Sequence, residues 1–218
     1  VAGFRLDAVK HIDSFFMRNF IRDIKEKYGQ DFYVFGEFWN PDKDANLDYL
    51  EKIEERFDLV DVRLHMNLFE ASQAGADYDL RTIFNDSLIQ VKPDKAVTFV
   101  ENHDTQRGQA LESTVEEWFK SAAYALILLR EQGLPCVFYG DYYGISGQYA
   151  QQDFKEVLDH LLAIRKDLAY GEQTDYFDDP NCIGWVRSGT DNQSPLAVLI
   201  SNAQENDKTM FVGQEWAD

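Results

Sequence analysis

Short apolar segments alternate with longer amphipathic ones through the first 171 residues of the chain. Five of the short segments have the length and the β-branched or aromatic content of buried strands, and they cover residues 1–6, 32–36, 57–62, 96–100 and 135–139. Strands that alternate with amphipathic helices predict a parallel sheet with right-handed crossover connections. Periodicity alone does not distinguish an open sheet from a closed barrel.

The segments between these strands carry apolar residues at helical spacing. They predict helices over residues 14–28, 47–53, 64–71, 80–91, 115–132 and 154–168. The expected core-facing stripe of the first helix includes Phe16 and Phe20, and that of the fifth includes Trp118 and Phe119. From residue 176 the pattern becomes all-β, with strands predicted over residues 183–187, 196–201 and 209–212.

Composition narrows the classes of partner. The chain has 218 residues and a formal net charge of −18, which argues against nucleic acid and against an anionic membrane surface. No stretch of about 18 apolar residues is present, so no transmembrane helix is expected. The two cysteines, Cys136 and Cys182, are too few for a disulfide framework, and the apolar run around Cys136 predicts a buried free thiol.

Three of the predicted strands are followed by an acidic residue: Asp7, Glu37 and Asp104. The carboxyl ends of parallel strands meet at one edge of a sheet, so these acids can converge there. Arg5 lies two positions before Asp7, and on a strand its cation would share a face with that acid and keep it ionised. From the residues alone, Arg5 and Asp7 also fit a structural ion pair, and the Asn-His-Asp sequence ending in Asp104 also fits a turn or a helix cap.

The segments around these acids read GFRLDAVKH, GEFW and FVENHDTQ, and a further segment, VFYGDYYG, follows at residues 137–144. In this order they resemble the signature regions of the α-amylases of glycoside hydrolase family 13, most closely the bacterial liquefying type. The resemblance implies an α/β fold that is a partial (β/α)8 TIM barrel, strands four to eight with their helices, over residues 1–174. It also implies that residues 175–218 begin an antiparallel β-domain.

The resemblance also implies roles for the residues at the strand ends. Asp7 matches the nucleophile that forms a covalent glycosyl–enzyme intermediate, and Glu37 matches the general acid/base. Asp104 matches a third acid that holds sugar hydroxyls and stabilises the transition state. Arg5 matches the arginine that keeps the nucleophile ionised, and His103 matches a histidine that binds the sugar next to the cleaved bond.

A second group of residues follows from the same comparison. Lys10 matches a lysine that contacts sugar on the leaving-group side. His11 matches a residue whose backbone carbonyl binds a structural calcium ion, most of whose other ligands lie outside this chain. Trp39 follows Glu37 by two residues and fits either an aromatic platform for a sugar ring or a core tryptophan.

The expected function is retaining endo-hydrolysis of α-1,4-glucosidic bonds in starch, glycogen or maltodextrins. The alternatives are a related α-glucan transferase or maltooligosaccharide-forming enzyme, or a non-catalytic glucan-binding or scaffold fragment. Because five strands leave a barrel open, we expect a piece of a longer enzyme that associates through its open edges or with the missing N-terminal half. The residues do not decide the cellular compartment.

Overall fold

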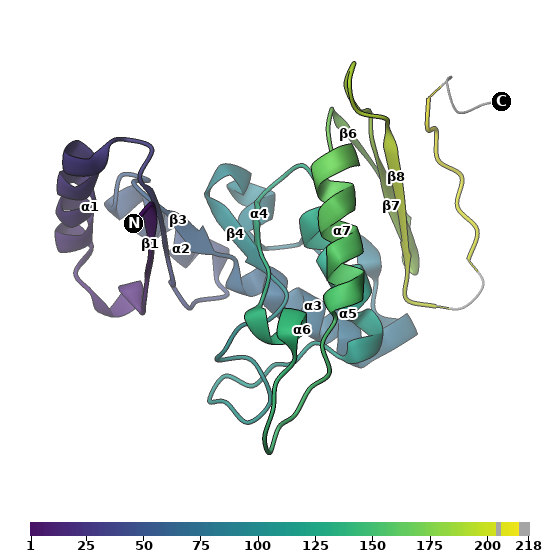
Figure 1. The fold of residues 1–218 in the computed structure, drawn as a ribbon, viewed down its shortest axis with the longest axis horizontal. Helices are drawn as coiled ribbons and strands as arrows, with labels where there is room; N and C mark the ends of the chain where they lie inside the picture. Colours follow the sequence, from purple (N-terminus) through teal and green to yellow (C-terminus); the bar gives the residue numbers. More distant parts are fainter. Residues whose placement is uncertain (204–205, 214–218) are drawn as a thin grey trace. The chain divides into compact units, whose positions relative to one another are not determined.

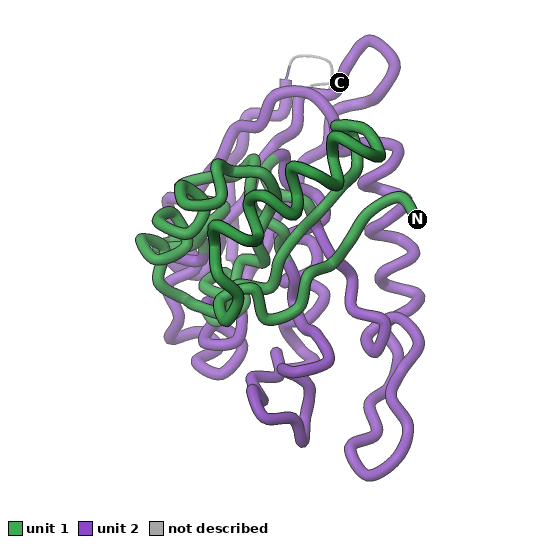
Figure 2. The backbone as a smooth tube through the Cα atoms, turned by 90° about the vertical axis from the view of Figure 1, so that its left-hand side faces the viewer, with its two compact units in different colours: residues 1–66, 84–98, 132–134 green, residues 67–83, 99–131, 135–218 purple. Residues whose placement is uncertain are grey.

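The computed structural model describes residues 1–203 and 206–213, and it divides into two compact units, which are coloured separately in Figure 2. The first unit comprises Val1–Met66, Phe84–Thr98 and Gln132–Leu134. The second unit comprises Asn67–Ile83, Phe99–Glu131 and the described residues from Pro135 onward. The predicted domain boundary between residues 174 and 175 stays a prediction; it falls within a strand that begins at Gln173.

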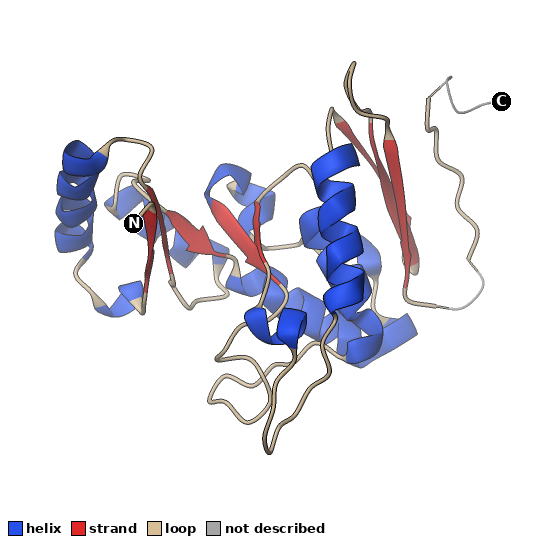
Figure 3. Ribbon diagram, in the orientation of Figure 1, coloured by secondary structure: helices blue, strands red, loops and turns tan. Residues whose placement is uncertain are grey.

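Two sheets are present among the described residues (Figure 3). The first has five strands in sequence order, β1 Gly3–Leu6, β2 Tyr33–Gly36, β3 Asp58–Val60, β4 Ala96–Phe99 and β5 Leu134–Cys136. The pairs β1–β2, β2–β3 and β3–β4 are parallel. The second sheet is antiparallel, with β6 Gln173–Asp179, β7 Cys182–Arg187 and β8 Leu196–Ser201. This pair of sheets confirms the predicted fold class, a partial barrel followed by a β-domain.

Helices follow the strands of the first sheet (Figure 1). The α-helices are α1 Ser14–Tyr28, α2 Lys43–Lys52, α3 Val62–Ala74, α4 Leu88–Val91, α5 Glu117–Leu128, α6 Tyr139–Tyr143 and α7 Lys155–Leu168. Single 3-10 turns occur at η1 Val9–His11, η2 Gly75–Asp77, η3 Leu80–Thr82 and η4 Pro93–Lys95. The predicted helix over residues 80–91 is therefore wrong in its middle, because the chain makes only η3 at the start of this range and the short α4 at its end.

Helix α1 begins where the side chain of Asp13 accepts a hydrogen bond from the backbone N–H of Phe16, at 2.8 Å. Its buried residues are Met17 and Ile21. The predicted stripe is wrong at Phe16 and Phe20, which are exposed and stack on each other with centroids 5.9 Å apart. The buried face of the helix is thus centred on Met17 and Ile21 rather than on the phenylalanines.

The second unit has a core around α5 and the antiparallel sheet. Phe119 and Tyr124 of α5 are buried, and the indole N–H of the fully buried Trp185 in β7 donates to the Leu129 carbonyl, at 3.3 Å. The prediction that Trp118 is a core residue is wrong, because it is 52% exposed. Its indole N–H instead donates to the backbone carbonyl of Ser72, at 3.0 Å, and its ring lies against that of Phe119, with centroids 5.2 Å apart.

Three further expectations concern single segments. Residues 209–212 form no strand, so this predicted strand is wrong; β6 instead joins β7 and β8 in the antiparallel sheet. Cys136 forms no disulfide, but it is exposed and not buried as predicted, whereas Cys182 forms no disulfide and is buried. Among the described residues, no helix has both the length and the apolar character needed to cross a membrane.

Candidate active site

The candidate site of the first unit lies where β1 and β2 end. The parallel register places Leu6 opposite Gly36, so Asp7 and Glu37 leave their strands side by side. The ladder continues beyond the strands, because the Glu37 N–H donates to the Leu6 carbonyl at 2.8 Å. A Cβ at Gly36 would lie 2.7 Å from the Phe57 ring, so only glycine allows the strand to approach its neighbours this closely before Glu37.

The Arg5 guanidinium joins the two acids. Its Nη1 donates to Asp7 Oδ1 at 2.6 Å, and its Nη2 donates to Glu37 Oε2 at 3.2 Å. Arg5 and Asp7 therefore do share a face, as their spacing on the strand predicts. The structure thus brings together Arg5, Asp7 and Glu37, three of the residues that the sequence singles out.

The two carboxyl groups have different surroundings. The Asp7 side chain is 73% exposed, whereas that of Glu37 is 9% exposed. Glu37 Oε2 also accepts a hydrogen bond from the Ala8 N–H, at 3.2 Å, and Ala8 adopts the left-handed conformation, with φ of 47°. This conformation is rare for a residue with a side chain. An open carboxylate beside a buried, hydrogen-bonded one is an arrangement in which one group can attack and the other can exchange a proton.

Lys10 and Trp39 meet at the same end of the sheet. The Lys10 ammonium donates to the backbone carbonyl of Trp39, at 3.1 Å. Trp39 is half-buried, and its ring centroid lies 6.3 Å from that of His65. A lysine held near a partly open aromatic ring fits the predicted sugar contacts, which stay predictions.

His11 ends the 3-10 turn η1 and is exposed. The described residues contain no group of three or more His, Cys, Asp or Glu side chains that could hold a metal ion. Calcium takes six to eight oxygen ligands, so the side chains described do not by themselves fit a calcium site. The role of His11 as a calcium ligand stays a prediction.

His103 and Asp104 belong to the second unit, in the turn that follows β4. Asn102 forms this turn: its side-chain oxygen accepts from the backbone N–H groups of Asp104, at 2.9 Å, and Thr105, at 3.0 Å. The Asp104 carboxylate takes no part in capping and lies 3.3 Å from His103 Nε2. Asn102 thus fills the capping role that the sequence left open for Asp104, and the Asp104 side chain remains accessible to a ligand.

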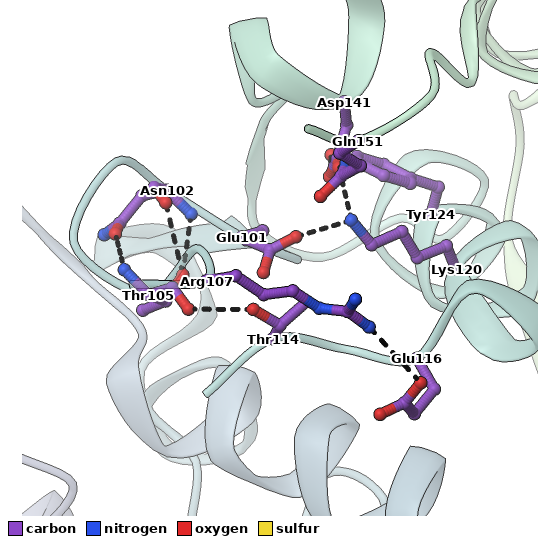
Figure 4. A network of polar contacts seen from close by, with 10 residues as sticks. All are labelled: Glu101, Asn102, Thr105, Arg107, Thr114, Glu116, Lys120, Tyr124, Asp141 and Gln151. Atoms are coloured by element: carbon purple, nitrogen blue, oxygen red, sulfur yellow. Dashed lines mark hydrogen bonds and ion pairs between the residues drawn. The ribbon is translucent and has the colours of Figure 1, made fainter. Parts of the chain in front are cut away.

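Beside this turn is a buried ionic cluster that the sequence analysis missed (Figure 4). Lys120 is fully buried and pairs with Glu101, at 2.5 Å, and with Asp141. Burial raises the pKa of the Glu101 carboxyl to about 7, and the nearby Asp141 charge acts in the same direction, against the opposing charge of Lys120. The available signal was a single lysine at a core-facing position of an apolar helix, next to Phe119.

A parallel α/β sheet with acidic side chains at the carboxyl ends of its strands is the arrangement that barrel-type α/β enzymes use for catalysis. The family assignment agrees with this class. The family model described as "Alpha amylase, catalytic domain" matches residues 1–191. The chain therefore belongs to the α-amylase catalytic-domain family, which confirms the resemblance seen in the sequence motifs.

Two similar proteins have names that describe their activity. The glucan 1,4-alpha-maltohexaosidase of Bacillus sp. (strain 707) is 47% identical over 99% of this chain and 43% of its own length. The alpha-amylase of Geobacillus stearothermophilus is 44% identical over 100% of this chain and 40% of its own length. This chain thus spans about two fifths of the length of these relatives.

Among solved structures, the alpha-amylase from Geobacillus thermoleovorans, complexed with acarbose, superposes with a TM-score of 0.69. The match covers 94% of this chain and 49% of that chain, at 23% sequence identity. At this level of identity the similarity establishes the fold alone, in agreement with the partial barrel and β-domain described above.

Proposed function

We propose that the protein is a retaining glycoside hydrolase that cleaves internal α-1,4-glucosidic bonds in starch, glycogen or maltodextrins. Asp7 is the nucleophile and Glu37 the general acid/base. Asp104 stabilises the oxocarbenium-like transition state, and His103, Lys10 and Trp39 bind sugar. The proposal concerns the whole protein, since its relatives are more than twice as long as this chain.

One observation carries this proposal: a single guanidinium, that of Arg5, contacts both Asp7 and Glu37. Retaining enzymes need their two carboxyl groups about 5–5.5 Å apart, and a shared guanidinium keeps two carboxyl groups close together. The cation favours the ionised form of Asp7, which a nucleophile requires. The position of Glu37 at the end of the adjacent parallel strand lets it protonate the glycosidic oxygen of the bond whose anomeric carbon Asp7 attacks.

The names of the similar proteins support the choice of substrate and also a second candidate. One is named for action on 1,4-alpha-linked glucan and the other is named as an alpha-amylase. These names support hydrolysis of such chains. The maltohexaosidase name favours an enzyme that releases a defined maltooligosaccharide as the alternative. The two candidates share the acids and differ in the lengths of their products.

Hydrolysis of a blocked maltoheptaoside reporter by the whole protein tests the proposal. The variants Asp7→Asn and Glu37→Gln should each lower turnover by several orders of magnitude while circular dichroism remains that of the wild type. Asp23→Asn, which alters an exposed acid on α1, is the matched control and should leave turnover unchanged. Near-normal turnover in either active-site variant would contradict the assigned role. Chromatography of the products would separate the two candidates.

Two further expectations about partners belong to the proposal. The net charge of −18 supports a protein that binds neither nucleic acid nor an anionic membrane surface. Strands β1 and β5 are the outermost strands of the five-stranded sheet, and unpaired strand edges attract further strands. We therefore propose that these edges pair with further strands of the whole protein or with a second copy. Light scattering on the isolated chain would reveal self-association.

A further inference from the structure

The buried cluster of the second unit connects three elements around one ammonium group (Figure 4). Lys120 of α5 donates to Glu101, two residues beyond the end of β4, at 2.5 Å, and to Asp141 of α6. Asp141 also accepts from the Tyr124 hydroxyl, at 2.6 Å, and from the Gln151 amide, at 2.6 Å. Lys120 is therefore a bridge between the end of β4 and the segment that begins with α6.

The charges of this cluster do not balance. Glu101, Lys120 and Asp141 are each at most 1% exposed, so water does not screen them. One ammonium neutralises one of the two carboxylates, and Asp141 has two further hydrogen-bond donors, whereas Glu101 depends mainly on Lys120. Glu101 Oε1 has no hydrogen-bond partner of ordinary geometry, although the Thr114 hydroxyl is near enough to favour its charged form. A buried acid in this state costs stability, so a role in function would explain its presence.

Glu101 leads directly into the turn that carries the proposed functional residues. The backbone N–H of Asn102 donates to the Thr105 hydroxyl at 2.9 Å, and Asn102 in turn holds the N–H groups of Asp104 and Thr105. Thr105 is buried, and its carbonyl accepts from the Ser113 N–H at 2.9 Å. The turn is thus fixed at its far end by Thr105 and at its near end by the bond between Glu101 and Lys120.

We propose that Glu101, held by Lys120, is a positioning residue that fixes the Asn102–Thr105 turn and so aims Asp104 at the substrate. The inference rests on the proposed function, because it extends the role given there to Asp104. Glu101 itself touches no substrate. It acts through the backbone of the next three residues. Its carboxylate is needed because it accepts the hydrogen bond from the Lys120 ammonium that fixes the start of the turn.

The variant Glu101→Met separates this role from a purely structural one. It removes the hydrogen bond that ties Lys120 to the start of the turn. Lys120 and Asp141 remain as a pair of opposite charges, so the melting temperature should not fall. A misplacement of about 1 Å in a catalytic group can cost about 100-fold in rate, and we expect a loss of that order in kcat with little change in KM. Glu101→Gln retains an oxygen that can accept from Lys120 and should restore most of the rate.

A double-mutant cycle tests whether Glu101 acts through Asp104. Adding Glu101→Met to Asp104→Asn should cause no further loss of kcat, because the Asp104 carboxylate that Glu101 positions is already absent. Additive losses would overturn the proposal. Lys155→Met, which removes an exposed lysine–aspartate pair of α7, is the matched control and should change neither rate nor exchange.

Amide hydrogen exchange supplies a readout that does not depend on activity. In Glu101→Met, residues 102–105 should exchange faster than in the wild type, while the exchange of α5 stays the same. Unchanged exchange of the turn, or an unchanged kcat in a folded variant, would overturn the proposal even if Asp7-dependent hydrolysis is confirmed. If Asp7-dependent hydrolysis is absent, the proposed function fails, and the exchange result still decides whether Glu101 holds the turn. If Glu101→Met does not fold, Lys120→Met is tested by the same criteria.

Discussion

At the scale of single residues, the site depends on one guanidinium shared by two acids. Arg5 contacts Asp7 and Glu37 through two different nitrogens, which the rigid planar guanidinium holds at a fixed separation. The contact between Arg5 and Asp7 was predictable, because residues two apart on a strand share a face. The contact of Arg5 with Glu37 was not, because it depends on the register between two strands that are about thirty residues apart.

Arg5→Lys should therefore impair the site without unfolding the protein. An ammonium is a point charge on a flexible stem and lacks the rigid fork that holds the two carboxyl groups at separate nitrogens, so we expect kcat/KM on the maltoheptaoside reporter to fall about 100-fold. Arg22→Lys, at an exposed pair on α1, is the control and should behave as the wild type. An Arg5→Lys enzyme with wild-type kcat/KM would show that the shared guanidinium is dispensable.

At the scale of elements, most strands and the helices α1 and α7 follow from periodicity and caps, whereas the segment before β4 does not. The sequence predicts one helix over residues 80–91, but the chain forms α4 only at its end. Two caps fix the start of α4: the local Ser87 hydroxyl accepts from the Gln90 N–H, and the buried Asp61 carboxylate, from a distant segment, accepts from the backbone N–H groups of Leu88 and Ile89 as well as from that of Leu64. The contribution of Asp61 comes from a distant segment and cannot be read from the residues around α4. The exposure of Trp118 likewise depends on which distant residues pack around it.

Removal of the Asp61 cap should be costly. Asp61→Ala leaves three N–H groups at the starts of α3 and α4 without their acceptor in a buried site, so we expect a loss of about 2–4 kcal/mol in the free energy of unfolding. Urea denaturation measures this loss. Asp13→Ala, which removes an exposed cap of α1, is the comparison and should cost about 1 kcal/mol. Equal losses in the two variants would contradict the role given to Asp61.

At the scale of the whole molecule, the buried cluster should leave a signature in the pH dependence of stability. The pKa of Glu101 is raised to about 7 in the folded protein by burial, from an ordinary value of 4.5. Between pH 4.5 and about 7 the folded state therefore binds more protons than the unfolded state. The contribution of the Glu101 carboxyl to the free energy of unfolding is fully present below pH 4.5 and is lost as the pH rises to about 7. Lys120 and Asp141 face the same carboxyl and set the size of the effect.

Glu101→Gln removes this titration. The free energy of unfolding of the wild type, relative to the variant, should fall by up to about 3 kcal/mol as the pH is raised through this window. Denaturation of both proteins at a series of pH values measures the difference. A wild-type advantage that grows with pH would contradict a pKa of Glu101 that is raised in the folded protein.

The central claim for the whole protein is that Asp7 becomes covalently bonded to the sugar. A fluorinated glucosyl substrate that slows breakdown of the intermediate, followed by peptide mass spectrometry, tests this most directly. The account predicts one sugar adduct on the peptide that contains Asp7, and no adduct in Asp7→Asn. An adduct on another residue, or turnover with inversion at the anomeric carbon and no adduct, would contradict it.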